Sequence, residues 1–176
     1  MIITDDLNIN GPGANTLAIQ RSPADGTPRF RIFLFDNRNK TIAVNISGLT
    51  ISNGHPVDGA NGADAGGISN FNATVNLTSM VIKDNSAGNG ISGGGGSGGG
   101  IINLGTMTIT SSTINGNSTG TGAGDPAGVG GYGGGIYNAG TLTLINTTVA
   151  GNKTGDGLAS GGYGGGIYMR LTAHSR

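Results

Sequence analysis

The chain has no cysteine, no tryptophan and no glutamate among its 176 residues. Without cysteine it forms neither disulfide bonds nor thiolate metal sites. Its nine acidic residues are therefore all aspartate. Aspartate favours turns, whereas glutamate favours helices. This imbalance argues against long helices.

Charge is also scarce, at 10% of residues, and the formal net charge at pH 7 is zero. No basic stripe is available to neutralise phosphates, so we do not expect a nucleic-acid partner. No stretch approaches the roughly 18 apolar residues of a membrane span. The first residues also lack the charged and apolar regions of a secretory signal peptide. We interpret the chain as a piece of a larger protein, so that absence leaves its compartment open.

Glycine, in contrast, is abundant, with 38 residues. The glycines gather between alternating apolar segments, which predicts ordered coils joined by loose loops. These loops span residues 54–66, 86–98, 118–133 and 153–164. Long loops on one side of a repeat protein are a common binding face.

A short phrase, Gly-Gly-Ile, recurs along the chain and contains Ile68, Ile101, Ile136 and Ile167. These isoleucines are separated by 33, 35 and 31 residues. Self-similarity at such a period is typical of a solenoid, in which each unit buries its apolar side against its neighbours.

Between these phrases, apolar side chains follow one spacing of two, three and two residues. Four rows show it: Val44, Ile46, Leu49, Ile51; Val75, Leu77, Met80, Ile82; Met107, Ile109, Ser112, Ile114; and Leu142, Leu144, Thr147, Val149. A spacing of two indicates a strand with alternate side chains inward. The spacing of three indicates a bend between two strands.

Asparagines recur at two further positions of the repeat. Asn85, Asn117 and Asn152 follow the last apolar residue of a row, where Gly54 stands in the first row. We expect this set to take the left-handed conformation of a sharp corner. The second set is Asn70, Asn103 and Asn138. Stacked asparagines can form an amide ladder along the axis, and ordinary turn residues are the alternative.

These patterns predict an all-β fold: a right-handed, single-stranded parallel β-helix of about five coils with three short parallel sheets. The predicted β-helix domain covers residues 1–168, and residues 169–176 form a non-repeat tail. Polar caps are not visible in the sequence, so we expect open strand edges and self-association through the β-helix ends.

The phrases LTISNG, GTMTITSSTINGN and GGGIYNAGTLTLINTTVAGN resemble right-handed parallel β-helix repeats. The resemblance covers about residues 2–168 and is closest to adhesin-like surface proteins of bacteria and archaea and to polymorphic outer-membrane protein repeats. It implies an extracellular or cell-surface location and a polysaccharide or cell-surface ligand. Pectate lyases, pectin esterases and phage tailspikes share this architecture, so the resemblance does not fix the function.

No convergent catalytic set is evident in the sequence. The candidates for acid, base or nucleophile are Asp125, Asp156, Ser92 and His55. Ser92 lies in a G-x-S-x-G match, but the strand before it and the helix after it that a nucleophile elbow needs are missing. Asp58 and Asp64 are candidate calcium ligands. Solvated loop residues are the simpler interpretation of these acids, so we expect no cofactor, with calcium as the open alternative.

Two sets of side chains are candidates for ligand binding. The first is an outward threonine face that includes Thr106, Thr108, Thr141 and Thr143. It could order water on an ice lattice or bind a sugar chain, although threonine also simply favours exposed strands. The second set is Tyr132, Tyr137, Tyr163 and Tyr168, which form two pairs 31 residues apart. Such tyrosines can stack on sugars or pack on one another.

Three functional hypotheses follow from the sequence. The first is a non-catalytic structural or adhesive module of an extracellular protein. The second is a carbohydrate-active enzyme, such as a polysaccharide lyase, glycoside hydrolase or esterase, or a carbohydrate-binding β-helix. The third is ice binding through the threonine face.

Overall fold

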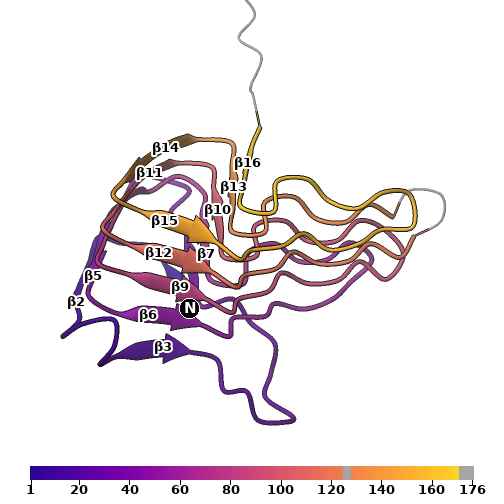
Figure 1. Cartoon of the computed structure of the whole chain (residues 1–176). Coiled ribbons are helices and arrows are strands. Elements are labelled where there is room, and N and C mark those ends of the chain that lie inside the picture. The colour runs from indigo at the N-terminus through magenta and orange to yellow at the C-terminus, as the bar shows by residue number, and fades with distance from the viewer. Residues whose placement is uncertain (125–127, 171–176) are drawn as a thin grey trace, which may run out of the picture.

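The computed structural model describes residues 1–124 and 128–170, whose regular secondary structure is entirely β. The strands form three parallel sheets stacked into one coiled body, and long arms extend together from one side of it (Figure 1). This confirms the predicted all-β parallel β-solenoid of about five coils.

Each complete coil contributes one strand to each of the three sheets, and β16 adds a sixth strand to sheet A alone. Sheet A contains β1 (Ile2–Ile3), β4 (Phe33–Phe35), β7 (Ile68–Asn70), β10 (Ile101–Asn103), β13 (Ile136–Asn138) and β16 (Ile167–Met169). Sheet B contains β2 (Leu7–Asn10), β5 (Ala43–Ser47), β8 (Thr74–Thr78), β11 (Thr106–Thr110) and β14 (Thr141–Ile145). Sheet C contains β3 (Ala18–Gln20), β6 (Thr50–Ser52), β9 (Val81–Lys83), β12 (Thr113–Asn115) and β15 (Thr148–Ala150).

The repeat isoleucines lie directly over one another. In sheet A, Ile101 is the register partner of both Ile68 and Ile136, and Ile136 is in turn the partner of Ile167. The last of these strands, β16, ends at Met169, one residue beyond the predicted end of the β-helix domain. The predicted boundary at residue 168 stays a prediction, because residues 171–176 lie outside the described part of the chain.

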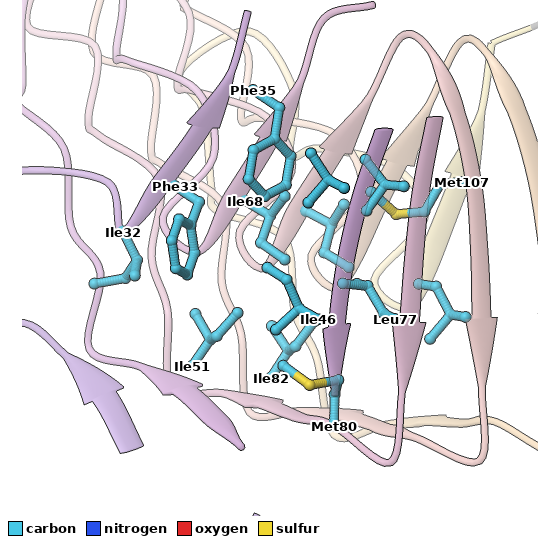
Figure 2. Close-up of a cluster of buried hydrophobic side chains, with 14 of the residues drawn as sticks. Ile32, Phe33, Phe35, Ile46, Ile51, Ile68, Leu77, Met80, Ile82 and Met107 are labelled. Carbon is cyan, nitrogen blue, oxygen red and sulfur yellow. The ribbon is translucent and has the colours of Figure 1, made fainter. Parts of the chain in front are cut away.

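The inward side chains fill a narrow apolar core between the three sheets (Figure 2). Phe33 and Phe35 pack there with ring centroids 5.7 Å apart, and Phe33 is the register partner of Ile68, which begins the isoleucine stack of the later coils. Core residues of the middle coils are fully buried, whereas those of the first and last coils are only partly buried. The core side chains of each coil are therefore covered by the neighbouring coils, as the repeat pattern predicts.

The backbone conformation at the corners differs from the prediction by one residue. At these corners the positive φ angles fall on Asn53, Asp84, Gly116 and Gly151, one residue before the predicted positions. The expectation that Asn85, Asn117 and Asn152 are left-handed was therefore wrong. The preceding residue makes the turn, and this leaves each asparagine side chain free to point inward.

Those inward asparagines form the predicted amide ladder. Asn85 Nδ2 donates to Asn117 Oδ1 at 3.0 Å, and Asn117 Nδ2 donates to Asn152 Oδ1 at 2.9 Å. Each Oδ1 also accepts the backbone N–H of the residue one coil below, so the ladder satisfies main-chain donors at the buried corner.

The second asparagine set forms a ladder in the same way. Asn70 Nδ2 donates to Asn103 Oδ1 at 2.8 Å, and Asn103 Nδ2 donates to Asn138 Oδ1 at 2.7 Å. In the next coil Met169 is the register partner of Asn138, so the ladder does not continue there.

In their described residues the glycine-rich segments are ordered arms, so the expectation of loose loops was wrong there. Parallel bridges link Gly59 to Gly90, Gly90 to Gly122 and Gly122 to Gly157. Within the stack, Gly120 N–H donates to Gly96 and Gly120 C=O accepts from Gly131, both at 3.0 Å. Outgoing and returning arms therefore bond to one another backbone to backbone. A β-carbon at Gly120 would lie 1.8 Å from the Gly88 carbonyl oxygen, so this packing requires glycine there.

Candidate functional site

The outer face of sheet A carries three parallel columns of side chains, because the repeat places equivalent residues one coil apart. The central column is formed by the outward residues Ser69, Ile102, Tyr137 and Tyr168. The arm-base column, where each arm joins the sheet, is Asp64, Ser97, Tyr132 and Tyr163. The third, the turn column after each sheet A strand, is Phe71, Leu104, Ala139 and Arg170.

These columns bound a groove with a cavity volume of about 430 Å³. Its lining residues are Arg31, Asp64, Ser69, Phe71, Ser97, Ile102, Leu104, Tyr132, Tyr137 and Arg170. The volume falls within the range of small-ligand pockets. Because the lining comes from successive coils, the groove follows the axis of the β-solenoid.

One end of the groove is polar and charged. Arg31 Nη2 donates to the backbone carbonyl of Asp64 at 2.7 Å, and Asp64 Oδ1 accepts the Ser97 N–H at 2.7 Å. These bonds hold the Arg31 guanidinium against the backbone of Asp64, and the Asp64 carboxylate against the backbone of Ser97, at the arm base. Since each group keeps unused donor or acceptor capacity, this end suits a ligand rich in hydroxyls.

The Asp64 carboxyl is crowded by the groove walls even though the residue as a whole has solvent-exposed surface. Desolvation raises its pKa, and the Ser97 N–H bond and the charge of Arg31 oppose that rise without cancelling it. Burial likewise lowers the pKa of the Arg31 guanidinium, against the attraction of Asp64. Both shifts indicate a partly dehydrated polar site.

The raised pKa gives a testable pH dependence. Folding disfavours ionised Asp64, so its unfavourable contribution is absent well below pH 3.8, the ordinary value, and grows as pH rises to the folded pKa. We expect Asp64→Asn to raise the melting temperature at pH 7 and to leave it unchanged near the acid end of a thermal-melt series. The exposed Asp25→Asn variant is the control. A loss of stability in Asp64→Asn at pH 7 would contradict this assignment.

The opposite end of the groove is aromatic and also carries Arg170 of the turn column. Tyr168 lies between Tyr137 and Tyr132, with ring centroids 5.4 Å and 5.0 Å away, and Tyr132 stacks on Tyr163 at 5.7 Å. The sequence predicts two equivalent pairs, and the structure interleaves them into one stack of four rings. The tyrosines do pack on one another, and Tyr132 and Tyr137 also line the groove.

An apolar strip joins the two ends. Phe71 is 46% exposed and Leu104 is 39% exposed, whereas Ile102 in the neighbouring central column is buried. Exposed large apolar side chains beside aromatic rings and charged groups are typical of binding surfaces.

The threonine candidates lie elsewhere, on the outer face of sheet B. Thr106 is the register partner of Thr141, and Thr108 is the partner of Thr143, as expected. On the same face, in the earlier strands β2, β5 and β8, Asn8, Asn45 and Asn76 form an exposed ladder. Asn45 Nδ2 donates to Asn8 Oδ1 at 2.8 Å, and Asn76 Nδ2 donates to Asn45 Oδ1 at 2.9 Å. Ice binding through this face stays a prediction, which measurements of thermal hysteresis and ice shaping would test.

Asp58 and His55 meet where the arm of residues 54–66 leaves the body. Asp58 accepts hydrogen bonds from Arg29 and from the Asn89 N–H, and His55 Nε2 lies 3.9 Å from Asp58 Oδ1. Desolvation alone would raise the Asp58 pKa, but these partners lower it overall. Desolvation, followed by the Arg29 charge, lowers the pKa of His55 despite the attraction of Asp58. This cluster joins neighbouring coils and lies outside the groove.

The remaining candidates are not brought together. Ser92 and Asp156 are exposed on the arms, and no hydrogen bond within the described residues joins Ser92 to His55. Asp125 lies outside the described part of the chain. Across residues 1–124 and 128–170 no three acidic or histidine side chains are placed to hold a metal ion. Asp58 and Asp64 belong to separate clusters.

Several groove residues were not singled out from the sequence, notably Arg31, Phe71 and Ser97. Ser97 is the repeat equivalent of Tyr132 and Tyr163, and Phe71 follows the asparagine phrase as Leu104 does. Alignment of the repeats by columns across sheet A could have found both. Arg31 belongs to an irregular early coil and carried no such signal.

Comparisons with protein-family models, with curated proteins and with solved structures found no match to this chain. Its described residues contain no helix long and apolar enough to cross a membrane.

Proposed function

We propose that this chain is a non-catalytic, adhesive β-helix module of an extracellular or cell-surface protein that binds a polysaccharide in the groove on sheet A. The observation that carries the proposal is the groove itself, which joins a tyrosine stack to a hydrogen-bonding charged end. The resemblance of the repeat phrases to adhesin-like surface proteins supports the same assignment.

The groove matches the chemistry of a sugar ring. A pyranose presents a face of C–H groups, which pack on aromatic rings, and a rim of hydroxyls, which donate and accept hydrogen bonds. Tyr132 and Tyr137 supply the aromatic surface, while Arg31, Asp64 and Ser97 supply the polar groups. Because the groove follows the solenoid axis, successive sugars of one chain can occupy its two ends.

A binding role fits better than a catalytic one. Glycosidases use two carboxyl groups about 5 to 9.5 Å apart across the scissile bond. Asp64 is the one carboxyl group among the described residues that line the groove. Its repeat equivalents are Ser97, Tyr132 and Tyr163, so the column offers no second acid.

Removing the aromatic surface tests the proposal. We expect Tyr132→Ala and Tyr137→Ala each to weaken binding to a glycan identified on an array by about tenfold, which corresponds to about 1.4 kcal/mol. Titration calorimetry with the soluble glycan measures the change. Tyr163→Ala is the matched control, because Tyr163 is 61% exposed at the far end of the same stack and does not line the groove. Equal losses in all three variants, or no glycan bound at all, would contradict the proposal.

Asp64 is the feature that favours the alternative of a carbohydrate-active enzyme, since a carboxyl group with a raised pKa suits general acid catalysis. Assays on polysaccharides separate the two functions. Turnover that disappears in Asp64→Asn while glycan binding persists would replace the adhesive assignment with an enzymatic one.

A further inference from the structure

The described residues of the arms carry a further column, near the outer ends of the arms. In four successive arms the residue after the bridging glycine is Ala60, Ile91, Ala123 or Leu158. Backbone bonds hold this register, since Ile91, Ala123 and Leu158 each donate an N–H to the glycine carbonyl one arm below, at 2.7 Å, 3.1 Å and 3.3 Å. We call these four residues the tip column.

The tip column is apolar and open to solvent. Ile91 is 66% exposed and Leu158 is 72% exposed, and both alanines are exposed as well. Residues bonded in parallel register present their side chains to the same side. Small and large side chains therefore alternate along this edge with a step of about 4.8 Å, the usual strand separation.

We propose that the tip column is a self-association surface that pairs with the same column of a second copy of this chain. Two copies related by a twofold axis would run their columns antiparallel. Ala60 of one copy would then face Leu158 of the other, and Ile91 would face Ala123. Each large side chain meets a small one at every step, so the column is complementary to itself, as a twofold interface requires.

The order of the residues is what selects a second copy as the partner. An antiparallel pairing of a column that alternated in size over an odd number of residues would set large side chains against large ones. With four residues the alternation sets a large side chain against a small one throughout, which permits dry interdigitation of the kind seen between paired sheets. A column of uniform size would show no such preference for itself.

The arms also preorganise the four side chains of the tip column. Their backbone bonds fix the spacing of the four residues before association, so little conformational entropy is lost on pairing. The contact is small, because stable interfaces bury about 1,200–2,000 Å² in total and four side chains from each copy provide far less. We therefore expect a weak dimer, seen at high concentration or when several copies are held on one surface.

Sedimentation velocity over a concentration series of the 176-residue chain tests this proposal. The wild type should associate with rising concentration, and a variant carrying both Ile91→Asp and Leu158→Asp should stay monomeric. Melting temperature and circular dichroism confirm that each variant is folded. A monomeric wild type at all concentrations, or association that persists in the double aspartate variant, would overturn the proposal; the second result would favour contact through the β-helix ends.

Exchanging the large and small side chains at positions 91 and 123 tests whether association depends on their fit or only on exposed apolar area. Ala123→Ile enlarges the exposed apolar area, yet it should weaken association by at least tenfold because Ile91 of the partner then meets isoleucine. Ile91→Ala should weaken it as well, and the double variant that carries both changes should restore association. Stronger association of Ala123→Ile than of the wild type, or a double variant that fails to associate, would contradict the proposal.

Discussion

Gly120→Ala should destabilise the fold by about 3 kcal/mol, the upper part of the range for overpacked sites. A β-carbon at this position would lie 1.8 Å from the carbonyl oxygen of Gly88, where no atom fits. Both groups belong to the stacked arms and are held by backbone hydrogen bonds, so relief requires at least two arms to separate. For a chain of this size that loss lowers the melting temperature by about 6–12 °C in a calorimetric scan.

Gly94→Ala provides the matched control. Gly94 also lies in an arm, but a β-carbon there would meet its nearest neighbour, the Val129 carbonyl oxygen, at an ordinary 3.5 Å. We expect its stability to stay within about 0.5 kcal/mol of the wild type. If Gly120→Ala and Gly94→Ala melted alike, the close packing of the arms described here would be incorrect.

Asn117→Ala should cost about 2–4 kcal/mol, because it interrupts the buried corner ladder at its centre. The Asn117 amide accepts from both the backbone N–H and the side chain of Asn85, and it donates to Asn152 and to the Ile82 carbonyl. Truncation leaves the buried Asn85 N–H without an acceptor, and each orphaned buried group costs about 1–3 kcal/mol. Urea denaturation measures the difference.

Asn45→Ala separates burial from hydrogen bonding. Asn45 also bonds to an asparagine on either side, but its ladder is exposed on sheet B. Water can replace those partners, so we expect a change below about 0.5 kcal/mol. Equal losses for Asn45→Ala and Asn117→Ala would show that ladder membership, and not burial, sets the cost.

The coil itself could be predicted from the sequence because its signals are local and repeated. The spacing of two, three and two residues places Val75, Leu77 and Ile82 inward, and all three are buried. The recurring isoleucine gives the length of one coil, and the register follows because a slip by one residue would turn every apolar side chain outward.

The arms could not be predicted, since a high glycine content usually indicates a flexible chain. Here glycine instead allows backbones to approach within bonding distance, as at Gly120 and Gly131. That role depends on the position of the neighbouring arm, which composition does not reveal. The prediction that the corner asparagines are left-handed was wrong for a related reason. Either of two adjacent residues could have made the turn, and the sequence does not show which one does.

The candidate site was only partly visible in the sequence. Tyr132, Tyr137 and Asp64 were identified as chemistry-bearing residues, but their meeting in one groove required the arm-base column to lie against the central column of sheet A. The interleaving of Tyr168 between Tyr137 and Tyr132 likewise depends on side-chain packing across two columns. Repeat spacing alone describes each column separately.

The register of the coils underlies the groove, both buried ladders and the tip column, and paired cysteines measure it directly. The chain has no native cysteine, so a variant with Thr108→Cys and Thr143→Cys contains only these two thiols. The two residues are register partners on neighbouring strands, and their Cα atoms lie about 4.8 Å apart. This separation suits a disulfide. We expect this pair to close under mild oxidation, whereas Asn45→Cys with Thr143→Cys, three coils apart, should stay reduced. Closure of the distant pair, or failure of the neighbouring one in a folded variant, would contradict the stacked coil.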